Sequence, residues 1–178
     1  MHLLLLSGRP GTGKTEYSVQ LATLGFAAIE TDKDPQWLER LQVRTLEQAV
    51  SVRNQARSLG ENLVIEWGYF PVLLPSVRLL RAAGFDAWWL DGDPGALVES
   101  YKQRWKIPDP MQSGQPYRLQ KDRIDSAWPE LERFYGPSRI LWTVDAGPTY
   151  MTFDNFCSSI LPGFNPLPED GTEGRPIP

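Results

Sequence analysis

A glycine-rich segment near the start of the chain has the residue types and spacing of a phosphate-binding loop. It reads LSGRPGTGKT from Leu6 to Thr15, between an apolar run and a segment with helical spacing. Gly8, Gly13, Lys14 and Thr15 satisfy the pattern G-x-x-x-x-G-K-[ST] in full. Glycines allow backbone N–H groups to turn inward around phosphates, and the following helix adds the positive end of its dipole. The residues predicted to contact the nucleotide are Gly8, Gly11, Thr12, Gly13, Lys14 and Thr15.

The last two residues of this loop indicate which ligand it takes. The Lys14 ammonium would reach the β- and γ-phosphates, and the Thr15 hydroxyl would bind Mg²⁺. We therefore expect the chain to bind ATP together with Mg²⁺. GTP is not excluded, because the sequence contains no motif that would distinguish the two bases.

Asp32 stands where a general base would be useful. It lies in the segment AAIETDKD, just after the second apolar run. Ligands of a parallel sheet bind at the carboxyl ends of its strands, so Asp32 would lie beside the phosphate-binding loop. A carboxylate there can accept the proton of a hydroxyl that attacks the γ-phosphate. The alternative is that Asp32 or Asp34 caps the next helix, and Asp34, directly before Pro35, is the better cap.

Glu66 ends the third apolar run, in the segment NLVIEWGYF. We predict that it acts near Mg²⁺, either through a bound water or by orienting the acceptor. Thr15 and Glu66 are thus the predicted residues of the metal site. Any strand that leaves the core can end on an acidic residue, so the same pattern is compatible with no function.

Basic residues follow the fourth apolar run, on both sides of a loop rich in proline, glycine and glutamine. They are Lys102, Arg104, Lys106, Arg118, Lys121 and Arg123. We interpret residues 102–123 as a lid that closes over the phosphates, offsets their charge and excludes water. Arg104 is the first candidate for phosphate contact, and Arg118 or Arg123 is the second. A solvated basic helix face would have the same composition.

Aromatic residues fall in the segments that should border an acceptor pocket. Trp37 and Trp67, together with Lys33, are the predicted residues of that pocket, and Trp105 is a further candidate. Tryptophan rings there would stack on a base or on a sugar. Ordinary packing is the alternative for each of them. Trp142 lies in an apolar run and is expected in the core.

The elements that must position these residues alternate in type along the chain. Short apolar runs, expected as strands, occur at 3–6, 26–29, 63–66, 87–90 and 140–144. Segments with helical spacing occur at 14–24, 45–59, 72–83, 94–105, 121–134 and 153–160. This alternation predicts an α/β fold, a three-layer sandwich in which helices cover both faces of a five-stranded parallel sheet.

Length and composition indicate one domain. The 178 residues suffice for one hydrophobic core, and we expect a catalytic domain at 1–162 and a tail rich in proline and glycine at 163–178. A net charge of −4 excludes a protein that binds polyanions by bulk charge. The single cysteine, Cys157, excludes an internal disulfide, and no apolar run is long enough to span a membrane. We expect a cytoplasmic protein of undetermined oligomeric state that does not associate with membranes.

Four segments together resemble the small P-loop kinases in order and spacing. They read SGRPGTGKTEYS, IETDKD, LVIEWGYF and WWLDGDPGALVESYKQR. Over residues 1–160 the chain is most similar to the polynucleotide-kinase-like group of AAA-domain kinases, and more distantly to gluconate- and shikimate-type kinases. The resemblance implies the strand order 2-3-1-4-5, Asp32 as catalytic base and Arg104 at the transferred phosphate. The arginine that polynucleotide kinases carry shortly after the aspartate is absent, and DKDPQW offers Lys33 and Trp37 instead.

The expected function is ATP-dependent transfer of the γ-phosphate to a hydroxyl group. The hydroxyl would belong to a small metabolite, a nucleoside or a nucleic acid, and the sequence does not distinguish among these acceptors. Two alternatives stay open. A nucleotide or nucleoside-monophosphate kinase would need no base at Asp32, and a nucleotide-binding module would hydrolyse ATP slowly without any acceptor.

Overall fold

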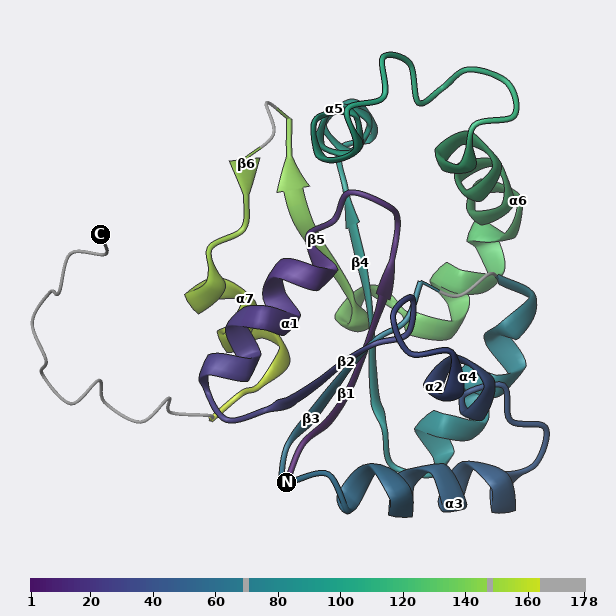
Figure 1. Ribbon diagram of the computed structural model, residues 1–178, viewed down its shortest axis with the longest axis vertical. Helices are drawn as coiled ribbons and strands as arrows, with labels where there is room; N and C mark the ends of the chain where they lie inside the picture. The colour runs from purple at the N-terminus through teal and green to yellow at the C-terminus, as the bar shows by residue number, and fades with distance from the viewer. Residues whose placement is uncertain (69–70, 147–148, 164–178) are drawn as a thin grey trace, which may run out of the picture.

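A six-stranded sheet runs through the computed structural model, which describes residues 1–68, 71–146 and 149–163 (Figure 1). The strands are β1 (Leu3–Gly8), β2 (Ala27–Glu30), β3 (Leu63–Glu66), β4 (Asp86–Gly92), β5 (Ile140–Asp145) and β6 (Thr149–Tyr150). They are ordered β2-β3-β1-β4-β5-β6, and all neighbouring pairs are parallel except β5 and β6. The predicted α/β fold and the predicted order of the first five strands are confirmed.

Helices cover both faces of this sheet. The described α-helices are α1 (Lys14–Thr23), α2 (Pro35–Arg40), α3 (Leu46–Arg57), α4 (Leu74–Ala82), α5 (Pro94–Trp105), α6 (Pro116–Tyr135) and α7 (Phe153–Ile160). Two short 3₁₀ turns, η1 (Pro71–Leu73) and η2 (Pro137–Arg139), precede α4 and β5. In Figure 1, α1 and α7 lie to one side of the sheet, whereas α2, α3, α4 and α6 lie to the other.

The central strand β1 contributes to both layers of the core. Leu3 and Leu5 pack in the cluster that α3, α4 and α6 cover, whereas Leu4 and Leu6 pack in the cluster beneath α1 and α7. All four are at most 4% exposed, because successive side chains of a strand point to opposite faces. The glycine-rich loop therefore leaves the sheet at its centre, between the two helical layers.

Aspartate residues cap the two helices that follow β2 and β4, namely α2 and α5. The Asp34 carboxylate accepts hydrogen bonds from the backbone N–H groups of Gln36 and Trp37 at the start of α2. Asp93 accepts one from Ala96 at the start of α5. Asp34 is thus the cap, as predicted, and Asp32 lies outside the helix.

Four details differ from the predicted elements. The edge strand β6 was not predicted, and α2 was expected only through its cap at Asp34 and not as a helical segment, because two and six residues respectively are too few to show a period. Helix α6 begins at Pro116 rather than at residue 121. Trp142 is 50% exposed rather than in the core, since β5 has only the two-residue β6 outside it.

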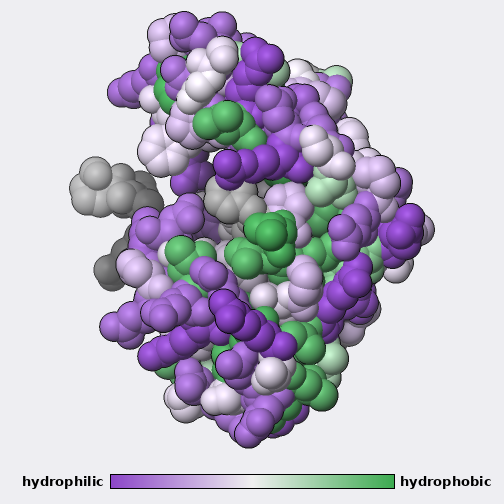
Figure 2. All heavy atoms as spheres, turned by 90° about the vertical axis from the view of Figure 1, so that its right-hand side faces the viewer, coloured by the Kyte–Doolittle hydropathy of each residue, from purple (hydrophilic) through white to green (hydrophobic). Residues whose placement is uncertain are grey.

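The surface on the α6 side of the molecule is mainly hydrophilic, with hydrophobic side chains gathered near its middle (Figure 2). No described helix is both long and apolar enough to cross a membrane. The predicted tail at 163–178 lies outside the described residues from position 164 onward.

Candidate active site

A cavity of about 650 Å³ opens where β2 and β3 end and the glycine-rich loop leaves β1. Lys14, Thr15, Asp32, Glu66 and Arg104 all line it, although they come from four separate segments of the chain. A parallel sheet explains this meeting, because the carboxyl ends of its strands share one edge. The structure therefore brings the predicted catalytic and metal-site residues into one cavity.

The loop between β1 and α1 depends on glycine at two positions. Gly8 has φ +148°, and a Cβ atom there would lie only 2.2 Å from the carbonyl oxygen of Leu90 on β4. Gly13 has φ +81° and immediately precedes α1, which begins at Lys14. Side chains other than hydrogen are strained in this backbone region, so the glycines of the motif are needed for the loop to close against β4.

Lys14 points its ammonium group back into the loop. Its Nζ atom donates hydrogen bonds to the carbonyl oxygens of Gly8 (3.2 Å) and Arg9 (2.9 Å). Burial lowers the pKa of Lys14 to about 8, although the carboxylates of Glu66 and Asp32 act in the opposite direction. A buried cation held by carbonyl oxygens is well placed to exchange those partners for phosphate oxygens.

Thr15 and Glu66 bring oxygen donors together at one end of the cavity. The Thr15 hydroxyl donates a hydrogen bond of 3.0 Å to Glu66 Oε1. Glu66 Oε2 is buried and has no hydrogen-bond partner among the described residues. Burial raises the pKa of Glu66, whereas Lys14 and the Thr15 hydroxyl act to lower it. A hydroxyl and an unsatisfied carboxylate oxygen are the hard oxygen donors that Mg²⁺ or its bound waters prefer.

Arg104 reaches the same place from the last turn of α5. Its two terminal nitrogens lie 3.4 and 3.5 Å from Thr15 Oγ1. The guanidinium is therefore next to the hydroxyl of Thr15, the last residue of the glycine-rich loop.

The segment after β2 also contributes to the lining of this cavity. Asp32 and Lys33 both line the cavity, and Lys33 Nζ lies 2.9 Å from Glu30 Oε2 in an ion pair. Asp32 is thus separate from the cap at Asp34 and faces the cavity that also contains Lys14.

The tryptophans divide between the cavity and the core. Trp105 is 57% exposed and lines the cavity, whereas Trp37 is 5% exposed, packs in the core with Leu41 and does not line it. Trp67 borders the cavity but is fully buried in the same core cluster as Trp37, so it packs as a core residue. Leu38 and Gln42, from α2 and the residues after it, line the cavity instead. Sequence reasoning missed them, because a helix of six residues is too short to reveal which side faces the core.

Arg118 and Arg123, the second candidates for phosphate contact, lie on α6 and do not line this cavity. Arg118 donates a hydrogen bond to the carbonyl oxygen of Met111 and lies 3.6 Å from Asp122. Arg123 borders a separate groove together with Val72 and Leu119. Their contact with phosphate, like the closing of the lid, stays a prediction.

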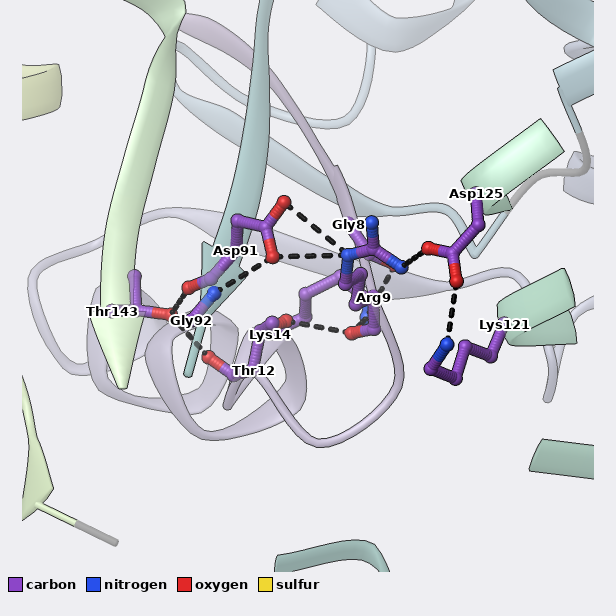
Figure 3. A network of polar contacts seen from close by, with 9 residues as sticks. All are labelled: Gly8, Arg9, Thr12, Lys14, Asp91, Gly92, Lys121, Asp125 and Thr143. Atoms are coloured by element: carbon purple, nitrogen blue, oxygen red, sulfur yellow. Dashed lines mark hydrogen bonds and ion pairs between the residues drawn. The ribbon is translucent and has the colours of Figure 1, made fainter. Parts of the chain in front are cut away.

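A polar network behind the loop was not predicted (Figure 3). Arg9, the residue after Gly8, pairs through Nε with Asp91 Oδ1 (3.0 Å) and through Nη1 with Asp125 Oδ1 (2.6 Å). Its guanidinium also lies 5.3 Å from the centre of the Trp128 ring. The sequence contained a signal for one partner, because Asp91 lies near the end of an apolar run as Glu66 does.

Residues near the end of the described chain hold the other side of the loop. Thr143 Oγ1 donates to the carbonyl oxygen of Thr12 (2.9 Å), and the Tyr150 hydroxyl donates to that of Gly11 (2.9 Å). Tyr150 and Met151 also line a second cavity of about 470 Å³, which shares Thr15 and Arg104 with the first. The glycine-rich loop thus lies between two cavities.

Comparison with known proteins identifies the architecture. No protein-family model and no curated protein matches the chain. A shikimate kinase from Acinetobacter baumannii, in complex with shikimate, matches with a TM-score of 0.53 at 18% identity, over 90% of this chain and 92% of that one. A gluconokinase from Sinorhizobium meliloti 1021 matches with a TM-score of 0.52 at 16% identity, over 89% of each chain. The chain has the fold of these P-loop kinases.

A second shikimate kinase, from Bacteroides thetaiotaomicron, matches with a TM-score of 0.50 at 21% identity, over 89% of this chain and 94% of that one. At such identities the likeness concerns the fold. The resemblance to the polynucleotide-kinase-like group is not confirmed by these matches.

Proposed function

We propose that this protein is an ATP-dependent kinase that transfers the γ-phosphate to an acceptor hydroxyl group. The observation that carries the proposal is the cavity shared by Lys14, Thr15, Glu66, Arg104 and Asp32. It combines a phosphate-binding loop with the carboxylate of Asp32 in one cavity, and transfer to a hydroxyl uses both a phosphate site and a base.

Each residue has a distinct part in the proposed reaction. Lys14 and Arg104 offset the negative charge of the transferred phosphoryl group. Asp32 accepts the proton of the attacking hydroxyl at one of its carboxylate oxygens. Thr15 and Glu66 would hold Mg²⁺, which supplies charge stabilisation to the nucleotide phosphates when bound.

The acceptor is proposed to be a small molecule. The similar structures named above are kinases of small metabolites, and shikimate is bound in one of them. A nucleic-acid acceptor has no support from these matches.

The test is transfer of labelled γ-phosphate from ATP with Mg²⁺ to a panel of sugars, polyols and nucleosides. We expect Asp32→Asn to bind ATP as the unmodified protein does and to lose roughly two to four orders of magnitude in acceptor-dependent rate. The matched control is Asp34→Asn, two residues away, because asparagine caps helices as well as aspartate does. Equal rates for Asp32→Asn and the control would contradict the role of Asp32 as base.

A further inference from the structure

We infer that the acceptor is neutral or carries an amine, and that it is not a carboxylate, a phosphate ester or a nucleic acid. The inference rests on the proposed function and concerns the charges in the same cavity. It follows from which cations line the cavity, where each of them is engaged, and which acidic groups face them.

The described lining contains three cationic side chains, and each already has a task or a partner. Lys14 donates hydrogen bonds to the carbonyl oxygens of Gly8 and Arg9, inside the phosphate-binding loop. Arg104 lies within 3.5 Å of the Thr15 hydroxyl, at the same end. The remaining cation, Lys33, is paired with Glu30 at 2.9 Å.

Arginines near the cavity are engaged elsewhere. Arg9 pairs with Asp91 and Asp125, behind the loop. Arg118 donates to the carbonyl oxygen of Met111 and does not line the cavity. Among the described lining residues, no cation lacks a partner, and an anionic group on the acceptor would have to displace Glu30 from Lys33 to gain one.

Acidic groups also line the cavity where the acceptor would bind. Glu30 and Asp32 come from the end of β2 and the residues after it, and Glu66 lies beside Thr15, so the described lining carries as many acidic as basic side chains. The nucleotide phosphates add further negative charge. An anionic acceptor would therefore lose its hydration without gaining a partner and would be repelled, whereas a neutral or cationic acceptor avoids this cost.

The rest of the wall suits a neutral polyhydroxy compound. Thr31, Gln42 and Gln120 line the cavity with groups that both donate and accept hydrogen bonds. Leu38, Leu73 and Trp105 add apolar surface, on which the C–H face of a sugar or the face of a base can pack.

The experiment compares compounds that differ mainly in charge. One set is glucose, glucosamine and gluconate, and another is uridine, UMP and a 5′-hydroxyl oligonucleotide, within a wider panel of sugars, polyols, nucleosides and their acids and phosphates. Acceptor-dependent ADP release gives kcat/KM, and calorimetry gives binding to the protein loaded with Mg²⁺ and a non-hydrolysable ATP analogue. We expect the best acceptor to be neutral or cationic, with its anionic counterpart at least roughly tenfold lower in kcat/KM.

The two proposals fail in different ways. An anionic compound as the best acceptor would overturn the inference and leave the kinase proposal intact. Absence of acceptor-dependent ADP release across the panel, with ATP still bound, would overturn the kinase proposal. The charge preference is then read from calorimetry, where tighter binding of anionic members than of their neutral counterparts contradicts it.

A variant that changes the charge balance tests the cause. Glu30→Gln frees Lys33 from its ion pair and removes one negative charge from the wall. We expect the ratio of binding constants, anionic to neutral, to rise about fivefold to tenfold, which is the effect of one charge a few ångströms away in a partly hydrated site. The double variant Glu30→Gln/Lys33→Gln should lose this rise. An unchanged ratio in Glu30→Gln would show that the ion pair does not set the preference.

Discussion

The Lys14 ammonium group can donate hydrogen bonds either to the carbonyl oxygens of its own loop or to the phosphates of a nucleotide. In the protein without nucleotide, burial holds its pKa at about 8. Phosphate oxygens favour the charged form, so the pKa of Lys14 rises when a nucleotide binds. Above pH 8, binding must therefore take up a proton.

This linkage predicts a pH dependence of nucleotide affinity. Between pH 8 and 10, the affinity for ATP with Mg²⁺ should fall by up to about tenfold per pH unit, because the free protein loses the Lys14 charge that the complex retains. Calorimetry in buffers of different ionisation enthalpy should record uptake of up to one proton at pH 9. Lys14→Arg is the control, since a guanidinium does not titrate in this range. Proton uptake that persists in this variant would assign the effect to another group.

At the scale of elements, Arg9 connects the phosphate-binding loop to two others. Asp91 stands near the end of β4, and Asp125 lies on α6 just after the proposed lid at residues 102–123. Burial raises the pKa of Asp91, and the Arg9 guanidinium acts to lower it. Removal of the Asp91 charge would leave Arg9, whose side chain is 16% exposed, with Asp125 as its one ion-pair partner among the described residues.

Asp91→Asn should therefore destabilise the fold. We expect the free energy of unfolding in urea to fall by about 3 kcal/mol, as for a broken buried ion pair. The matched control is Glu130→Gln, which breaks the exposed pair with Arg78 and should cost less than about 1 kcal/mol. Equal losses in the two variants would mean that the Arg9 network contributes no more than a surface pair.

At the scale of the whole molecule, the sheet separates two hydrophobic cores. Leu80 on α4 belongs to one core and Phe156 on α7 to the other, and both are fully buried. Within the second core, Phe156 stacks on Tyr17 with ring centres 4.0 Å apart. Substitutions on opposite faces share no contact through the sheet, whereas the two stacked rings do.

Double variants should reveal this division. Leu80→Ala and Phe156→Leu should have free-energy losses that add within about 0.5 kcal/mol, because they act on separate cores. Tyr17→Leu with Phe156→Leu should lose less than the sum of the single changes, since either change alone already removes the stack. Urea unfolding of the single and double variants measures both. Equal coupling in the two pairs would contradict the separation.

The sequence predicted the site where the candidate residues form a local motif or mark the end of an apolar run. The phosphate-binding motif, and acidic residues at the ends of apolar runs, were sufficient to predict Lys14, Asp32 and Glu66 as neighbours of one cavity. The side to which Trp37 turns was not predictable, because α2 has only six residues. The partners of Arg9 were also missed, since Asp91 and Asp125 are 82 and 116 residues away. Such pairings depend on how elements meet and leave no local pattern.

The residues that hydrogen-bond to the glycine-rich loop are synthesised long after the loop itself. The loop leaves the ribosome long before Thr143 and Tyr150, which hold its carbonyl groups and follow Thr12 and Gly11 by 131 and 139 residues. The Tyr17 hydroxyl likewise donates a hydrogen bond to the carbonyl oxygen of Met151, which is synthesised 134 residues later. A nascent chain released from the ribosome before residue 143 would carry the complete motif without these braces. The loop therefore acquires these braces only after residues 143–151 have been synthesised.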